Sequence, residues 1–166
     1  MRPTPNVLLA VRGLARLESV SYHMERVLDL TEKQSQLFGL IEGEDAILLV
    51  AVANVTAGVD LEKLEPDGIK ADFAARRVRV VLPAAEIFSL ALDNERTYVH
   101  TRRTGLLARR KEDLETRARR EAERVLLDAA RETGILTRAG QGAQRVVEGL
   151  LRSLGFEQVE VVIAPS

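Results

Sequence analysis

The sequence contains no cysteine and no tryptophan among its 166 residues, and aromatic residues make up only 4% of it. The lack of cysteine excludes disulfides, thiolate nucleophiles and cysteine-ligated metal sites. With so few aromatic residues the core has to be aliphatic, and we do not expect an exposed aromatic platform that stacks on bases or sugars. No run of 18 apolar residues occurs, so we do not expect this chain to span a membrane.

An excess of charge is also lacking, because the net charge is −1. Domains that hold a nucleic-acid backbone usually have a clear basic excess, so we expect no nucleic-acid partner. Only two histidines occur, His23 and His100, and they form no H-x-x-x-H pair. Each is predicted on a solvated strand face, His23 with Ser21 and Glu25, and His100 with Tyr98 and Arg102. Because a catalytic base or a metal ligand needs convergent partners, we predict no catalytic residue, no cofactor and no metal site.

Residues 76–105 contain the clearest structural pattern, three short apolar-rich runs in succession. The run Arg77–Leu82 stops at Pro83, which has no amide hydrogen for a ladder, so we predict a strand end there. The runs Glu86–Leu92 and Arg96–Arg102 are separated by Asp93-Asn94-Glu95, residues typical of a tight hairpin. This pattern predicts an antiparallel sheet.

Further strands are predicted on the N-terminal side of this stretch. Alternating apolar and polar residues predict a strand from Val20 to about Leu30, followed by a polar loop over Thr31–Ser35. Leu37–Ile41 is interpreted as a short strand and Glu42–Asp45 as a turn. The near-continuous apolar character of Ala46–Val59 predicts a central strand.

A chain break at Glu65-Pro66-Asp67-Gly68 precedes a hairpin between Ile69–Phe73 and Arg77–Leu82. Helical spacing appears at both ends of the chain. We predict a short helix from Asn6, with Leu9, Val11, Leu14 and Leu17 apolar. Two helices are predicted over about Glu112–Thr133 and Thr137–Leu154, the latter burying Val146, Val147, Leu150 and Leu151. Alternation at Val159, Val161 and Ile163 predicts a final strand.

These elements predict one α+β domain over residues 1–166. A mostly antiparallel sheet of about five to seven strands is covered on one face by helices. The predicted order is one helix, several strands, two helices and a final strand that returns to the sheet.

Three groups of residues in the sequence are candidate binding sites. The basic residues Arg102, Arg103, Arg109, Arg110 and Lys111 could bind an anionic surface, but a solvated connector balanced by the acids that follow is the favoured interpretation. Gly140-Gln141-Gly142 lacks the strand and the GK[ST] of a phosphate loop, so a helix start or close helix packing is favoured. The acids Asp60, Glu62, Glu65 and Asp67 lack the pattern of a calcium loop and are interpreted as surface residues.

Five segments of the chain resemble, in order, those of an uncharacterised bacterial family called domain of unknown function 4230. The segments are Leu14–Ser19, Thr56–Leu61, Val80–Ile87, Arg103–Leu106 and Leu151–Phe156. The resemblance implies no activity and no catalytic residue. It implies that similar proteins often carry an N-terminal transmembrane helix, so membrane contact is expected only through an anchor absent from this chain.

The expected function is a non-enzymatic binding or scaffold domain that acts near a membrane. The alternative is a small hydrolase or ligand-binding enzyme that uses carboxylates not paired in the sequence. We also expect a homo-oligomer. An apolar edge containing Leu106, Leu107 and Leu127 beside the predicted helix 112–133 is expected to contact the partner chain.

Overall fold

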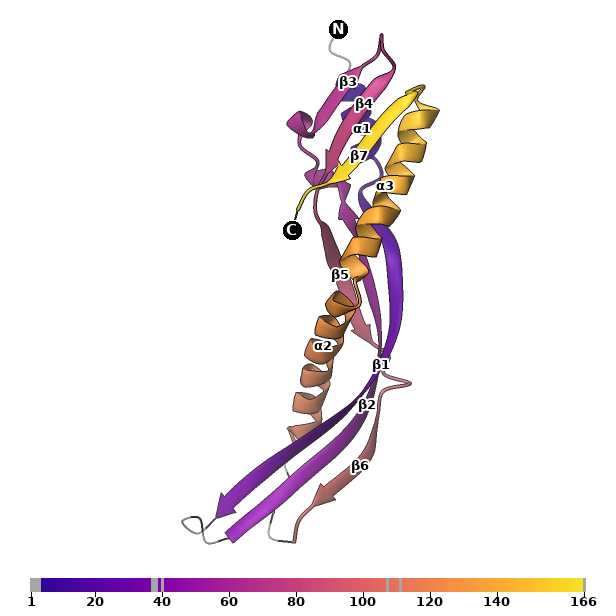
Figure 1. The fold of residues 1–166 in the computed structure, drawn as a ribbon. Coiled ribbons are helices and arrows are strands. Elements are labelled where there is room, and N and C mark those ends of the chain that lie inside the picture. The colour runs from indigo at the N-terminus through magenta and orange to yellow at the C-terminus, as the bar shows by residue number, and fades with distance from the viewer. Residues whose placement is uncertain (1–3, 37–38, 40, 107, 111, 166) are drawn as a thin grey trace. The chain divides into compact units, whose positions relative to one another are not determined.

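The computed structural model describes residues 4–36, 39, 41–106, 108–110 and 112–165. Figure 1 traces the elements along the chain. In order they are α1 (Thr4–Arg12), β1 (Arg16–Gln36), β2 (Ile41–Asp60), the short 3₁₀ turns Leu61–Lys63 and Pro66–Gly68, β3 (Ile69–Asp72), β4 (Arg77–Leu82), β5 (Ala85–Leu92), β6 (Tyr98–Thr104), α2 (Leu114–Glu132), α3 (Ile135–Ser153) and β7 (Gln158–Ile163). The predicted α+β class and element order are confirmed. The strands form two sheets: β2 pairs with β1, β5 and β6, and the other sheet has the order β3-β4-β7.

The residues group into two compact units, each with its own core. Unit 1 comprises residues 1–22, 56–89 and 133–166, and unit 2 comprises 23–55 and 90–132. Strands β1, β2 and β5 contribute residues to both units. The single domain over residues 1–166 stays a prediction.

In unit 1, β3 and β4 form the predicted hairpin, with Ile69 opposite Val80 and Asp72 opposite Arg77. The predicted strand end at Pro83 is confirmed, because β4 ends at Leu82. The final strand β7 returns parallel to β4. The core of this unit joins these strands to α1 and α3. Its members include Val7, Val11, Val78, Val80, Leu82, Val147, Leu151 and Val161.

Gly142 lets α3 approach β1 within unit 1. A Cβ added at Gly142 would lie 2.7 Å from the Cβ of Ser19, whose hydroxyl donates a 2.7 Å hydrogen bond to the carbonyl of Ala139. Gly140 likewise faces Ile163 of β7. The two glycines therefore lie inside α3 and permit close packing, the interpretation favoured from the sequence over a phosphate loop.

We expect Gly142→Ala to lower the free energy of unfolding by about 1–3 kcal/mol, because the added methyl group overpacks this contact. Gly149 is the matched control, since a Cβ there meets nothing within 4 Å in the same helix. Gly149→Ala should stabilise the chain by up to about 1 kcal/mol through helix propensity. Urea unfolding of both variants checks this. Equal effects at the two positions would contradict the close approach.

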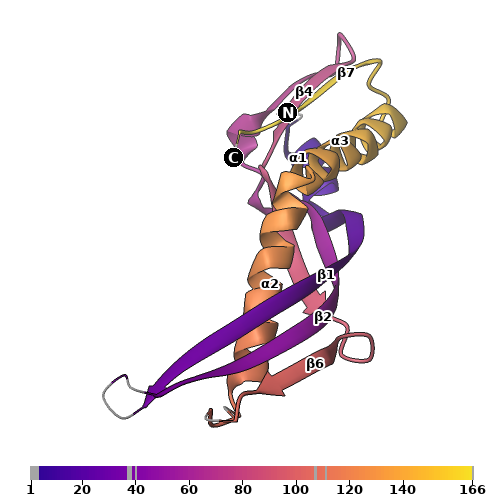
Figure 2. The same ribbon diagram turned by 60° about the horizontal axis from the view of Figure 1, so that its bottom comes forward.

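In unit 2, α2 packs its apolar stripe onto the strands (Figure 2), and among the described residues of this unit it is the one helix. Every second residue of β2 from Ile47 to Ala53 is buried against this stripe. The helix contributes Leu114, Ala118, Ala122 and Leu126, and β1 contributes Leu28. The central position of β2 and the helix over about Glu112–Thr133 were both predicted from the sequence.

The predicted loop at Thr31–Ser35 and the predicted turn at Glu42–Asp45 are wrong, because β1 and β2 extend through them. Polar residues in the extended part of β1 form hydrogen bonds with α2 and with the segment that precedes it. Glu32 accepts a hydrogen bond from Arg117 of α2, and Gln34 bonds the backbone N and O of Arg109 at 2.9 and 2.6 Å. The predicted strand Leu37–Ile41 falls mostly on residues outside those described.

The predicted hairpin between the runs 86–92 and 96–102 is also wrong. Strands β5 and β6 both pair with β2, and the loop between them stays attached to that strand. The amide of Asp93 donates to the carbonyl of Val52 at 2.8 Å, and the Thr97 hydroxyl accepts from the amide of Val52 at 3.0 Å. The Asp93 carboxylate accepts from the amides of Glu95 and Arg96, which closes the turn locally. A turn-forming sequence therefore links two successive partners of β2.

The helices differ from prediction in single residues. Leu9 of α1 and Val146 of α3 are exposed instead of buried. The helix α1 ends at Arg12, and Leu14 and Leu17 follow it. Gly155, with φ of +94°, ends α3 as expected for a C-terminal glycine. Within the described part of the chain, every helix is too short or too polar to cross a membrane.

Candidate functional site

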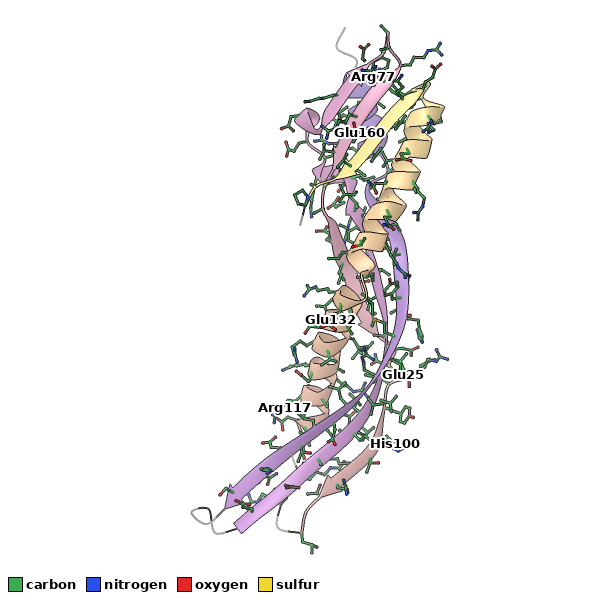
Figure 3. All side chains as sticks on the ribbon, viewed as in Figure 1. Glu25, Arg77, His100, Arg117, Glu132 and Glu160 are labelled. Carbon is green, nitrogen blue, oxygen red and sulfur yellow. The ribbon has the colours of Figure 1, made fainter. Side chains whose placement is uncertain are left out.

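The face of the unit 2 sheet that points away from α2 is the candidate site. Residues alternate along a strand, so those between the α2-facing positions lie on this side. We call it the open sheet face. It includes His23, Glu25, Val27, Asp29 and Lys33 of β1, Glu42, Glu44, Leu48, Val50, Val52 and Asn54 of β2, and Tyr98, Thr101 and Arg103 of β6, and of these Val52 is buried. In Figure 3, Glu25 and His100 lie on the side of the strands away from α2, which carries Arg117.

Apolar side chains lie exposed on both outer strands of this face, β1 and β6. Val27 is 60% exposed and Tyr98 is 52% exposed. Tyr98 lies opposite Val50, which is half-buried. Polar residues flank each of them along its strand, so exposed apolar and polar groups alternate on the face, and exposed apolar groups of this kind are typical of interaction surfaces.

His23 is held in one orientation at the end of the face. The His23 Nδ1 lies 2.9 Å from the side-chain Oδ1 of Asn54. Arg96 donates from Nη1 to the His23 Nε2 at 3.3 Å. Because arginine only donates, Nε2 accepts this bond, which leaves Nδ1 to donate to Asn54. His23 thus positions the Arg96 guanidinium on the face.

A shallow basin of about 600 Å³ connects these residues. Val50 and Val52 form part of its lining, together with His23, Glu25, Glu95, Arg96 and Tyr98. The basin holds both charge signs and no histidine pair. His100 lies outside it and stacks edge-on with Tyr98 at 6.3 Å between ring centroids. The two histidines therefore do not form one site.

The sequence predicted that Arg102 shares a face with His100. A β-bulge explains why it does not. The register steps from Leu48 opposite Thr101 to Leu49 opposite Val99, so His100 is an extra residue in β6. Arg102 is thereby turned towards the α2 side. There it donates to the fully buried Asp45 at 2.8 Å, and Thr104 donates to the same carboxylate at 3.0 Å.

The predicted basic cluster is consequently divided. Arg102 is bonded to Asp45, Arg103 lies on the open sheet face, and Arg109 and Arg110 are exposed in the segment before α2. Lys111 lies outside the described residues. This arrangement favours the solvated-connector interpretation over an anion-binding patch.

Unit 1 has a larger groove, of about 810 Å³, over β3, β4 and β7. Two arginines of β4 in this groove bond to residues of β7. Arg79 lies 3.2 Å from Glu160, and Arg77 donates to Gln158 at 2.8 Å. Figure 3 shows Arg77 and Glu160 on this sheet.

Among the acids at 60–67, Asp60 has structural partners. Asp60 accepts from the amide of Glu62 at 3.2 Å and caps the turn Leu61–Lys63. Lys63 lies 2.9 Å from Glu86 and 3.6 Å from Asp60, and its pKa is raised chiefly by the hydrogen bond to Glu86. Among the residues described, no three histidine, aspartate or glutamate side chains are placed to hold a metal ion.

A family model described as "Protein of unknown function (DUF4230)" matches residues 10–161. The chain belongs to the DUF4230 family. No curated protein and no solved structure matches it. The resemblance stated from the sequence is thus confirmed, and the family description assigns no activity.

Sequence reasoning missed the apolar part of this DUF4230 site. It placed His23 and Glu25 correctly on a solvated face, but it did not single out Val27, Tyr98 or Arg96. A signal existed, because Val27 interrupts the polar series Glu25, Asp29 and Thr31 on that face. The expected edge of Leu106, Leu107 and Leu127 is less distinct. Leu106 is exposed, Leu127 is half-buried, and Leu107 lies outside the described residues.

Proposed function

We propose that the chain is a non-enzymatic binding or scaffold domain that acts near a membrane, and that it binds its partner through the open sheet face. The observation that supports this most is the exposure of Val27 and Tyr98 beside half-buried Val50 on the side of the sheet away from α2. An antiparallel sheet can leave one face in water, but that face is then ordinarily polar. Exposed apolar side chains on such a face favour contact with a partner, because binding removes them from water.

The arrangement of charged groups supports a binding role over the hydrolase alternative. Glu121 has a lowered pKa and Arg124 a raised one, each chiefly because of the hydrogen bond between them on the outer side of α2. Such shifts reflect surface ion pairing and not preparation for proton transfer. Two acids of the unit 1 groove are likewise bonded to arginines, Glu157 to Arg76 and Glu160 to Arg79. The membrane part of the proposal rests on the family resemblance, in which an anchor often precedes this region.

A photoreactive phenylalanine analogue placed at Tyr98 in cells tests the proposal. We expect defined covalent adducts from position 98, recovered with the membrane fraction, because the face is occupied by a partner. The matched control is the same analogue at Glu123, which is exposed on α2. Adducts in the soluble fraction would remove the membrane part alone. Equal labelling, or none, at both positions would overturn the binding surface.

A further inference from the structure

We propose that the groove over β3, β4 and β7 in unit 1 binds a phosphate monoester, whose phosphate group is held by Arg77 and Arg79 of β4 with Lys70 of β3 beside them. This site goes beyond the proposed function, which concerns the open sheet face of unit 2. Three properties of the groove support it: the orientation of its arginines, its balance of uncompensated charge, and its volume.

Two arginines of β4 are presented side by side on the outer face of the unit 1 sheet. Val78, between them, points into the core, so Arg77 and Arg79 point away from it, about 6–7 Å apart along the strand. Arg77 donates from Nε to Gln158 Oε1 at 2.8 Å. The Arg79 Nε lies 3.2 Å from Glu160 Oε2. Among the described residues, no group accepts a hydrogen bond from the Nη nitrogens of either arginine. These nitrogens are therefore oriented by β7 and available to bind the oxygens of a phosphate in pairs.

The acids of the groove are for the most part engaged within the unit. Glu160 lies beside Arg79, and Glu157 forms an ion pair with Arg76. Asp72 lies at the turn between β3 and β4, where its Oδ1 accepts a hydrogen bond from a backbone amide at 3.0 Å. Within the described part of the chain it has no cation as an ion-pair partner. Asp72 is therefore the acid of the groove whose charge stays uncompensated.

Three cations of the groove keep their charge as well. Lys70 lies directly opposite Arg79 in the register of β3 and β4, which makes two like charges cross-strand neighbours and disfavours the pair unless an anion joins them. Arg77 bonds to a neutral amide, and Arg152 of α3 also lines the groove. As far as the structure describes the chain, none of Lys70, Arg77 and Arg152 has an acid as an ion-pair partner. Together with Asp72 they leave an excess of two positive charges.

This excess matches a phosphate monoester, which carries about −1.5 to −2 charges at neutral pH and has three strong acceptor oxygens. A carboxylate is a poorer match, because it has one charge and a single guanidinium satisfies both of its oxygens. The groove has a volume of about 810 Å³, within the range of about 300–1,000 Å³ that is usual for small-molecule sites. A phosphate ion fills only a small part of that volume, so the groove has room for the organic part of an ester.

Calorimetric titration of the purified chain with glycerol 3-phosphate tests the site. Arg77→Gln and Arg79→Gln should each raise the Kd by at least about tenfold, because each removes charged hydrogen bonds to the phosphate. Arg145→Gln is the matched control and should leave the Kd unchanged, since Arg145 is exposed on α3 and does not line the groove. Asp72→Asn should lower the Kd, because it removes the opposing charge while its side-chain oxygen still accepts from the turn amide. Circular dichroism checks that every variant is folded.

The same phosphate group occurs on soluble esters and on phosphatidic acid, and a second arm distinguishes these sources. The chain is sedimented with phosphatidylcholine vesicles that contain or lack phosphatidic acid. Sedimentation that requires phosphatidic acid and is lost in Arg77→Gln, without heat from glycerol 3-phosphate, would support the site with a lipid headgroup as its ligand. The reverse result would support it with a soluble ester. Binding in neither arm, or equal losses in Arg77→Gln and Arg145→Gln, would overturn the site, whatever adducts form at position 98.

Discussion

Replacing Gly58 with alanine is expected to lower the free energy of unfolding by about 3 kcal/mol or more, the upper part of the range for overpacking. A Cβ at this position would lie 2.0 Å from the carbonyl oxygen of Leu17 and 2.7 Å from Cε2 of Phe88. The Phe88 ring can rotate, but the Leu17 oxygen belongs to the backbone of β1. Relief therefore requires the backbone near Leu17 to move away from β2. Guanidinium unfolding followed by circular dichroism measures the loss.

The Phe88 ring supplies the control for this prediction. Phe88→Leu shortens the side chain that would meet the new methyl group and leaves the Leu17 carbonyl in place. If the backbone is the obstacle, Phe88→Leu should not rescue Gly58→Ala. Full rescue would show that the ring limits the site and would contradict the backbone explanation. Arg16 stacks over Phe88 at 4.2 Å from the ring centroid, so Phe88→Leu alone must be measured as well.

The elements that sequence reasoning predicted well are those whose own residues determine them. The run Ala46–Val59 is apolar enough to be recognised as a central strand, and Pro83 ends a strand because it has no amide hydrogen. The stripe of α2 follows from helical spacing alone. In each case the deciding property is local to the segment.

The elements that were missed depend on partners far along the chain. Glu32 and Gln34 extend β1 because Arg117 and Arg109 lie beside them, and a polar stretch without such partners is ordinarily a loop. The segment Asp93–Glu95 has hairpin chemistry, yet its bonds to Val52 place β6 along β2 and not along β5. Local turn preference cannot distinguish these two outcomes.

The candidate site was predictable only in part for the same reason. Alternation along β1 places His23 and Glu25 on a solvated face, which the structure shows as well. The alternation rule fails in β6, because the bulge at His100 reverses the faces of the residues that follow it. No residue type in β6 signals the bulge. The neighbourhood of Arg102 therefore had to come from the structure.

Asp45 is the second position at which a single replacement should have a large effect. Asp45→Ala is expected to lower the free energy of unfolding by about 3–5 kcal/mol, the usual cost of removing one partner of a buried ion pair. Asp45 is fully buried, and the Arg102 side chain is only 13% exposed. The loss arises because the guanidinium keeps its charge while its carboxylate partner is gone. Urea unfolding measures it.

Two comparisons distinguish burial of the charge from ion pairing in general. Glu160→Ala breaks the exposed pair with Arg79, whose side chains are 63% and 47% exposed, and should cost only about 0–1 kcal/mol. Asp45→Leu combined with Arg102→Leu removes both buried charges and should be less destabilising than Asp45→Ala alone. A double variant at least as unstable as Asp45→Ala would indicate that these side chains act through shape and not charge.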